Sequence, residues 1–480
     1  YVANVQTCRG SHTHTVLKDP DDDENVYIYV SGSAPVRPAE ELPGCVSALP
    51  SDDPESALFR IEVIQVPLDD PESAAIVSSP RIFEDLVAPP THGPAPADLE
   101  AIEEARAQGA FILELDGRSV ILPDRYVQPA LEQFMEQRGG TEVTAADSAA
   151  FRAYLPQMAQ QMGGGPEMEG MGPTQCHDIT VYPAVGLAGG ACEGYGLLLD
   201  IEDPVNPRRL DAVADSNFSY WHSATFDNAG TKLLFSDEWG GGSAPKCRES
   251  DPMEWGADAI FTIEEGDRME FQSYFKIPAA QTSQENCVAH NGSLIPIPGR
   301  DVMVQSWYQG GISVFDWSDP ANPVEIAFHD RGPVSAERLE NGGAWSAYWY
   351  DGHIVSSEIA RGLDVLVLTP SEALSENEIE AARSVRLELL NSQGQPQFEW
   401  PHTFALARAY VDQLERSRAV SQGWIDGVRA TLGEAEGASA AERRRTLEQL
   451  AREVRGDASE SLDPDRMILL ADAVDGLAGA

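Results

Sequence analysis

Four of the nine histidines begin short segments of the same design, and imidazole nitrogen is a common ligand of zinc and copper. The segments start at His12, His177, His222 and His290, and a fifth has Trp345 in the histidine's place. Such internal similarity is typical of repeat architectures, in which equivalent residues of successive repeats occupy equivalent places. The pattern therefore predicts that the four imidazoles share one structural position and together could hold a metal ion.

Short strands are the elements that would position these histidines. After His177, strands are predicted at 177–182, 185–189, 196–201 and 209–213, and the following units repeat this order. Asp-Pro-x-Asn-Pro turns recur after the third strand, where proline presets φ and asparagine tolerates left-handed geometry. Four short strands per unit are typical of a β-propeller blade, so we expect a mainly β fold with about five blades in this chain.

The innermost strands of a propeller line its central channel, which would bring the four histidines to the channel mouth. Second strands are expected to end at the same mouth, where Glu238 and Glu358 would add carboxylates and Trp307 an aromatic wall. Trp345 would join them from the innermost strand of the fifth blade. A zinc or copper ion is one use of such a ring. Hydrogen bonding to the backbone of the neighbouring blade is another use of repeat histidines, and metal-free catalysis is a third.

Helical composition interrupts and ends the propeller. Residues 1–84 are assigned to the first blade, 85–173 to a helical insertion with a Gly/Met-rich loop, 174–372 to the remaining blades, and 373–480 to a C-terminal helical bundle. In that last part, apolar residues recur at helical spacing between Phe404 and Leu414. This spacing predicts amphipathic helices that pack on one another.

The charge balance argues against several classes of partner. The chain has 78 acidic and 33 basic residues, and the resulting net charge of −45 repels nucleic acid and anionic lipid. No apolar run is long enough to cross a bilayer, so neither nucleic-acid binding nor membrane insertion is expected. The sequence contains no P-loop, dinucleotide fingerprint, nucleophile elbow or His-Glu-x-x-His motif. Any catalytic site must therefore come from residues that the fold assembles.

Six cysteines fit the same blade register. Three stand just before an innermost strand and three lie in loops between second and third strands: Cys8, Cys176 and Cys287, then Cys45, Cys192 and Cys247. Both places are on one face of a propeller, because each strand reverses direction. An even number of cysteines on one face favours disulfides formed in an oxidising compartment. Among the fifteen pairings that six cysteines allow, we expect 8–45, 176–192 and 247–287.

Several segments, in this order, resemble the LVIVD-repeat β-propeller proteins of bacterial secreted and cell-surface proteins. The stretches that begin at Cys8, Cys176, Trp221, Glu285 and Gly311 carry the resemblance, which covers residues 1 to about 370 apart from the insertion. It implies a seven-bladed propeller on an exported protein, and it implies no particular reaction.

Members of that family carry about two more blades ahead of the position of Tyr1. Those blades complete the ring, and a propeller needs a closed ring. The resemblance therefore implies that an N-terminal fragment, or further sequence, supplies the missing blades. Residues 1–6 are expected to form an outer strand.

The expected function follows from fold and compartment. We predict a secreted, disulfide-linked propeller that acts as a binding or scaffold module at the cell surface, with a protein or surface component as its partner. The alternative is a metalloenzyme, an oxidase or hydrolase, with copper or zinc in the histidine ring. The residues alone do not decide whether the chain is an enzyme.

Overall fold

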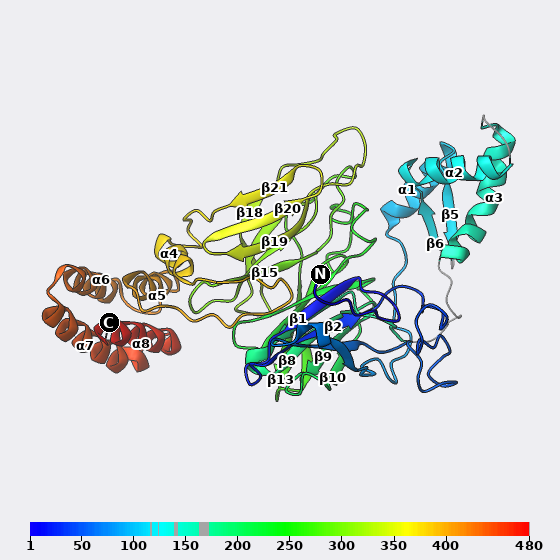
Figure 1. The fold of residues 1–480 in the computed structure, drawn as a ribbon. Coiled ribbons are helices and arrows are strands. Elements are labelled where there is room, and N and C mark those ends of the chain that lie inside the picture. The colour runs from blue at the N-terminus through cyan, green and yellow to red at the C-terminus, as the bar shows by residue number, and fades with distance from the viewer. Residues whose placement is uncertain (116–117, 123, 139–142, 163–171, 480) are drawn as a thin grey trace.

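Five antiparallel sheets follow one another as the blades of a β-propeller (Figure 1). The structure is a computed structural model that describes residues 1–115, 118–122, 124–138, 143–162 and 172–479. Blades 1 to 4 have four strands each, and blade 5 has three. The predicted β-propeller with about five blades in this chain is thereby confirmed.

The strands run in sequence order within each blade. Blade 1 consists of β1 (Thr13–Leu17), β2 (Asn25–Ser31), β3 (Glu62–Pro67) and β4 (Ala75–Ser78). Blade 2 consists of β7 (Asp178–Tyr182), β8 (Leu187–Cys192), β9 (Tyr195–Asp200) and β10 (Arg208–Val213). Blade 3 consists of β11 (Trp221–Phe226), β12 (Lys232–Asp237), β13 (Asp258–Glu264) and β14 (Arg268–Phe275). Blade 4 consists of β15 (Gly292–Ile295), β16 (Val302–Ser306), β17 (Ile312–Asp316) and β18 (Val324–His329), and blade 5 of β19 (Ala344–Tyr350), β20 (His353–Glu358) and β21 (Gly362–Leu366).

Neighbouring blades are joined along their innermost strands by side chains that donate to backbone carbonyls. A threonine or serine hydroxyl one or three positions after the repeat histidine reaches the innermost strand of the next blade. The bonds run from Thr13 to the His177 carbonyl, from Thr15 to Ile179 (2.6 Å), from Thr180 to Ala224 (2.8 Å) and from Ser223 to His290 (3.1 Å). This pattern, the blade seam, sets the register of each innermost strand against the next.

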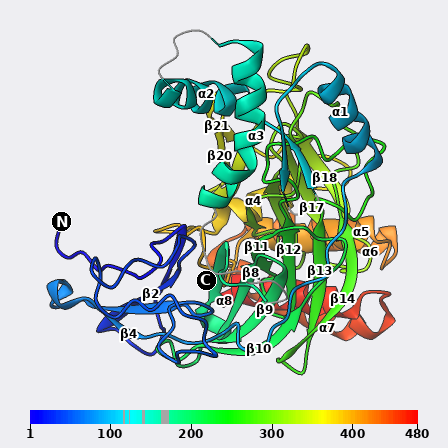
Figure 2. The ribbon, with the colours of Figure 1, turned by 90° about the vertical axis from the view of Figure 1, so that its right-hand side faces the viewer.

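The two ends of the series of blades keep apolar surface. On blade 5, Leu363 and Val365 of β21 and Trp345 of β19 are more than half exposed. On blade 1, a groove of about 530 Å³ lies between strands β2 and β3 and the N-terminal segment. Residues 1–6 form no strand there, so the predicted outer strand is wrong. Figure 2 shows blade 1 at one end of this series.

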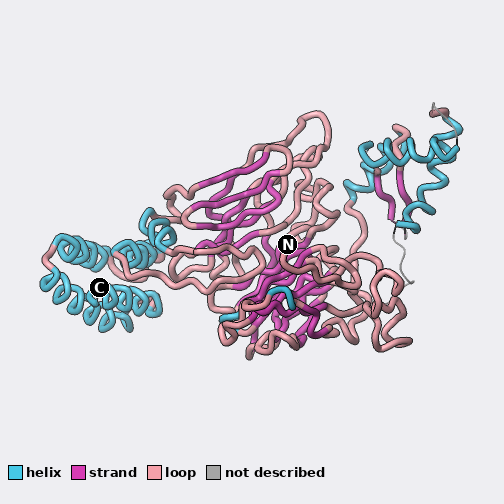
Figure 3. The backbone as a smooth tube through the Cα atoms, viewed as in Figure 1, coloured by secondary structure: helices cyan, strands magenta, loops and turns pink. Residues whose placement is uncertain are grey.

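Two helical units lie on opposite sides of the propeller (Figures 1 and 3). Between blades 1 and 2 lie α1 (Pro96–Ala107), the hairpin β5 (Ile112–Leu115) and β6 (Arg118–Ile121), α2 (Asp124–Arg138) and α3 (Ala145–Met162). After blade 5 come α4 (Glu376–Ser384), α5 (Phe404–Arg416), α6 (Gln422–Gly437), α7 (Ala440–Asp457) and α8 (Pro464–Gly479). The predicted C-terminal helices are confirmed, and their apolar stripes form one shared core. None of the helices in the described ranges is both long and apolar enough to cross a membrane.

The segment between α4 and α5, residues 386–400, crosses the base of the propeller. We call it the basal segment. It makes a hydrogen bond to each of the five blades. The pairs, from blade 1 to blade 5, are Asn391 with Val16, Gln395 with Val181, Phe398 with Asn228, Trp400 with Pro296 and Leu387 with Asp351, at 2.7–2.9 Å.

All three predicted disulfides are confirmed. Sulfur atoms are bonded in the pairs Cys8–Cys45, Cys176–Cys192 and Cys247–Cys287, and no cysteine is free. Each bridge ties the start of an innermost strand to a loop of the same face of the propeller. A bridge of this kind stabilises a fold by about 2–4 kcal/mol, chiefly by restricting the unfolded chain.

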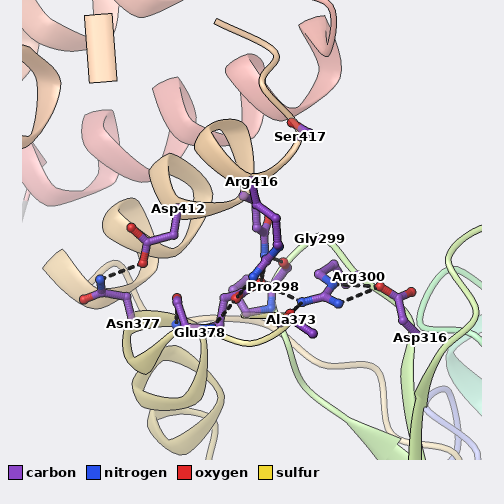
Figure 4. Close-up of polar contacts among 12 residues, drawn as sticks. Pro298, Gly299, Arg300, Asp316, Ala373, Asn377, Glu378, Asp412, Arg416 and Ser417 are labelled. Carbon is purple, nitrogen blue, oxygen red and sulfur yellow. Dashed lines mark hydrogen bonds and ion pairs between the residues drawn. The ribbon is translucent and has the colours of Figure 1, made fainter. Parts of the chain in front are cut away.

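A buried carboxylate anchors the bundle to blade 4 (Figure 4). Glu378 of α4 has no exposed surface, and its oxygens accept hydrogen bonds from Arg300, Arg416 and Gln413 at 2.6–2.9 Å. Arg300 also pairs with Asp316 of β17. Burial opposes ionisation, but the bonds from Arg416 and the charge of Arg300 hold the pKa of Glu378 below its usual value. The ionised carboxylate therefore joins three elements.

Replacing this carboxylate tests its role. Glu378→Gln leaves two guanidinium groups without their shared partner, and loss of one member of a buried charge pair costs about 3–5 kcal/mol. We expect the free energy of unfolding in urea to fall by that amount. Because folding lowers the pKa, the wild type should lose this stabilisation as the pH falls through that pKa, whereas the variant should not. Glu380→Gln, exposed on the same helix, is the control and should change stability by less than about 0.5 kcal/mol. Equal losses in both variants would contradict the anchoring role.

Candidate metal centre at the channel mouth

The four repeat histidines lie side by side at one mouth of the channel. Ring centroids are 4.4 Å apart between His12 and His177, 3.9 Å between His177 and His222, and 4.1 Å between His222 and His290. Each ring comes from the start of a different blade. The blade seam thus places four imidazoles in a row around the mouth.

The seam also fixes which nitrogen carries the proton in two of these rings. Nδ1 of His177 lies 3.1 Å from the carbonyl oxygen of His222, and Nδ1 of His290 bonds the carbonyl of Trp345. A carbonyl can only accept, so Nδ1 must be the protonated nitrogen in both rings. In a neutral ring Nε2 then carries a lone pair. The histidine's structural bond is thus the one that makes Nε2 available as a ligand.

The Nε2 atoms and one carboxylate meet at the mouth. Nε2 of His12 and Nε2 of His177 are 2.6 Å apart. Glu238, which follows β12, places Oε2 at 3.6 Å from Nε2 of His222 and Oε1 at 3.6 Å from Nε2 of His290. In the part of the chain that the structure describes, the one group with three ligand atoms all within 4.8 Å of one another is His177, His222 and Glu238.

Burial keeps these imidazoles uncharged. It lowers the pKa of His177 to about 4, with a smaller contribution from His12, and that of His290 to about 3. The pKa of His222 is also well below its usual value, because the ring is fully buried beside three other histidines. Burial raises the pKa of Glu238, although a bond from Tyr308 opposes this. Neutral imidazole is the form that binds metals.

An ion of ordinary size fits these donors. Tetrahedral zinc has bonds of about 2.0–2.1 Å, which puts neighbouring donors about 3.3 Å apart. The 3.6 Å between His222 and Glu238 is close to that value, and the three ligand atoms of His177, His222 and Glu238 all lie within 4.8 Å of one another, so a bound ion would draw them together. Nδ1 of His222 is buried without a hydrogen-bond partner. Two imidazoles and a carboxylate also match a known zinc donor set.

Of the other residues predicted at the mouth, Trp345 lies there, Trp307 lies in the protein core and Glu358 caps a turn. Trp345 is at the mouth, and its indole Nε1 donates to Nε2 of His290 at 3.1 Å. Trp307 is not, since it is fully buried in a core cluster of blades 3 and 4. Glu358 caps a turn of blade 5 by accepting from the backbone amides of Gly343 and Arg361.

Two tyrosines lie where Trp307 was predicted. Tyr308, one residue further on, donates from its hydroxyl to Oε1 of Glu238 at 2.5 Å. Tyr220 precedes β11 and stands edge-on to His177 with ring centroids 5.7 Å apart. Tyr308 bridges to Ala344 as Glu193 bridges to Trp221, but Tyr308 stands two residues beyond its second strand whereas Glu193 stands one beyond, so a fixed spacing does not identify it.

Comparison with known proteins finds distant similarities among solved structures. No family model and no curated protein matches the chain. Among solved structures, the computationally designed Ika4 protein is 12% identical, with 38% of this chain and 86% of that chain covered and a TM-score of 0.24. Saccharomyces cerevisiae Sqt1 is 11% identical over 38% of this chain and 41% of that chain, with a TM-score of 0.26. The periplasmic gluconolactonase PpgL of Pseudomonas aeruginosa is 7% identical over 74% and 80%, with a TM-score of 0.31. At such scores these similarities carry no inference about the site.

The assignment of protonated nitrogens can be tested directly. In metal-free protein labelled with ¹⁵N-histidine, long-range ¹H–¹⁵N NMR spectra should show His177 and His290 as neutral rings protonated at Nδ1, because each Nδ1 faces a carbonyl. His177→Gln and His290→Gln variants would assign the two signals by their disappearance. Protonation at Nε2 in both rings would contradict the seam geometry.

Proposed function

We propose that this chain is an exported β-propeller protein that binds a divalent transition metal at the channel mouth. The ligands are Nε2 of His177, Nε2 of His222 and Oε2 of Glu238, with His12 beside them. The observation that carries the proposal is that the blade seam holds Nδ1 of His177 and so leaves Nε2 as its donor, while His177, His222 and Glu238 place their ligand atoms within 4.8 Å of one another. Three disulfides favour an oxidising compartment outside the cytosol.

Zinc is the ion that this donor set fits best. Two imidazoles and a carboxylate with an unfilled fourth position are typical of zinc sites that activate water or polarise a carbonyl. A copper ion would bind better to the four imidazoles alone. Copper in the purified protein would therefore indicate a four-histidine site in place of the site with Glu238. Hydrolysis therefore fits the site better than oxidation as the reaction of an enzyme built on it.

Metal content separates this proposal from a purely structural role. Purified protein should contain about one zinc per chain by elemental analysis, since three neutral or anionic donors converge. A His177→Ala/His222→Ala double variant should lose the metal. The control is His353→Ala, because His353 is exposed on the β19–β20 turn of blade 5. Protein that is folded, free of metal and unable to take up zinc or copper would overturn the proposal.

A second candidate function, as a surface binding or scaffold module, is favoured by the exposed apolar ends of the blade series. An unpaired blade face and the open edge of β21 are aggregation hazards that propellers avoid by closing. We infer that about two further blades complete a seven-bladed ring, supplied by an N-terminal fragment or by further sequence, as the LVIVD-repeat resemblance implies. The groove on blade 1 and the β21 face of blade 5 would receive them.

The completing polypeptide should be detectable in native material. Intact mass and N-terminal sequencing are expected to find about two blades more than residues 1–480, either continuous with them or as a fragment that co-purifies. Leu363→Lys/Val365→Lys should release a separate fragment, because charge is placed on its docking face. Val324→Lys, exposed on the outer strand β18, is the matched control. Native material that consists of residues 1–480 alone would contradict the seven-bladed ring.

A further inference from the structure

One phenol controls the carboxylate of the metal centre. Tyr308 stands just after β16 in a left-handed backbone conformation, with φ of 52°. This conformation turns its side chain toward the mouth, where its hydroxyl donates to Oε1 of Glu238. Its ring also stands edge-on to His290, with centroids 4.7 Å apart. Tyr308 is thus packed between a candidate ligand and the histidine beside it.

The glycine-rich loop after Glu238 holds that phenol in place. A Cβ atom at Gly242 would lie 2.1 Å from the Tyr308 hydroxyl oxygen, so only glycine lets the backbone approach so closely. The φ of Gly242 is +63°, which also favours glycine. Asn286 fixes the loop by donating from Nδ2 to the Gly242 carbonyl at 2.6 Å. The hydroxyl therefore has little freedom to leave Glu238.

With Oε1 held, only the other oxygen of Glu238 is available to a metal beside His222. We propose that Tyr308 is the positioning residue of the metal centre, which makes Glu238 a one-oxygen ligand through Oε2. This inference rests on the proposed metal-binding function. It assigns a role to the glycine-rich loop of residues 240–242.

The same geometry leaves one coordination position open. Nε2 of His290 already accepts the indole N–H of Trp345, so it is occupied as an acceptor. His12 is exposed and belongs to the first blade, at the solvent side of the row. A metal held by His177, His222 and one oxygen of Glu238 then has its fourth position beside His12, whose Nε2 lies 2.6 Å from that of His177, and the position is open when the exposed His12 ring turns toward solvent. Water or a small anionic oxygen ligand such as a carboxylate or hydroxamate would bind there.

The test uses the whole chain with cobalt(II) as a spectroscopic substitute for zinc. Tyr308→Phe removes only the hydroxyl oxygen and should lower zinc affinity 10- to 100-fold, the usual effect of losing a partner that orients a ligand. Affinity is measured by competition with a chelator. The visible spectrum of the cobalt protein should also change, because Glu238 can then bind through both oxygens. Tyr348→Phe, on β19 in the channel wall away from the mouth, is the control and should change neither.

A thermodynamic cycle separates positioning from general destabilisation. In a Glu238→Gln background, Tyr308→Phe should have little further effect on zinc affinity, because its influence passes through the carboxylate. Gly242→Ala displaces the hydroxyl while keeping Tyr308, so it should also weaken zinc binding. It keeps the proposal testable if Tyr308→Phe fails to fold. If the wild type binds zinc but Tyr308→Phe binds it equally well with an unchanged cobalt spectrum, the positioning role is wrong and metal binding stands. If the wild type binds neither ion, both proposals fail.

Discussion

The seam between innermost strands is the interaction on which the rest of this propeller depends. Side chains at the start of each innermost strand donate hydrogen bonds to backbone carbonyls of the next blade. The register that these bonds fix brings the four repeat histidines, His12, His177, His222 and His290, to one level. The structural and metal-binding interpretations of repeat histidines are therefore compatible. Nδ1 donates to a carbonyl of the neighbouring blade, and this same bond leaves Nε2 as a base at the mouth.

A propeller with apolar surface at both ends of its blade series needs another means of holding its blades at fixed angles. The basal segment supplies it, because it bonds to one residue of every blade. Beyond it, the buried Glu378 joins blade 4 to α4 and α5. The opposite face is crossed by the chain that leads to α1, where Asp98 pairs with Lys246 and Arg248 of the blade 3 loop. Both faces of the propeller are therefore held by segments that lie outside the blades.

Periodic features were predictable and long-range polar contacts were not. Strand order, helical stripes and the three disulfides follow from spacing, since alternation and blade register are written along the chain. The exchange of Trp307 for Tyr308 depends on a single left-handed residue after β16, which no spacing reveals. The basal segment has no apolar period, and it is held by polar contacts with residues as many as 375 positions away. Glu238 was placed at the mouth, but its link to Tyr308 requires the fold.

The acidic surface and the neutral histidines act in the same direction. A net charge of −45 gives the molecule a negative potential that concentrates cations near its surface. At the mouth, burial keeps His177, His222 and His290 from becoming cationic, so they do not cancel that potential. The one charge among the donors is then the carboxylate of Glu238, held at a fixed angle by Tyr308. A site with neutral nitrogen donors, one oriented carboxylate and a negative surrounding field is electrostatically suited to a divalent cation. An anionic ligand would bind poorly there unless a cation were already bound.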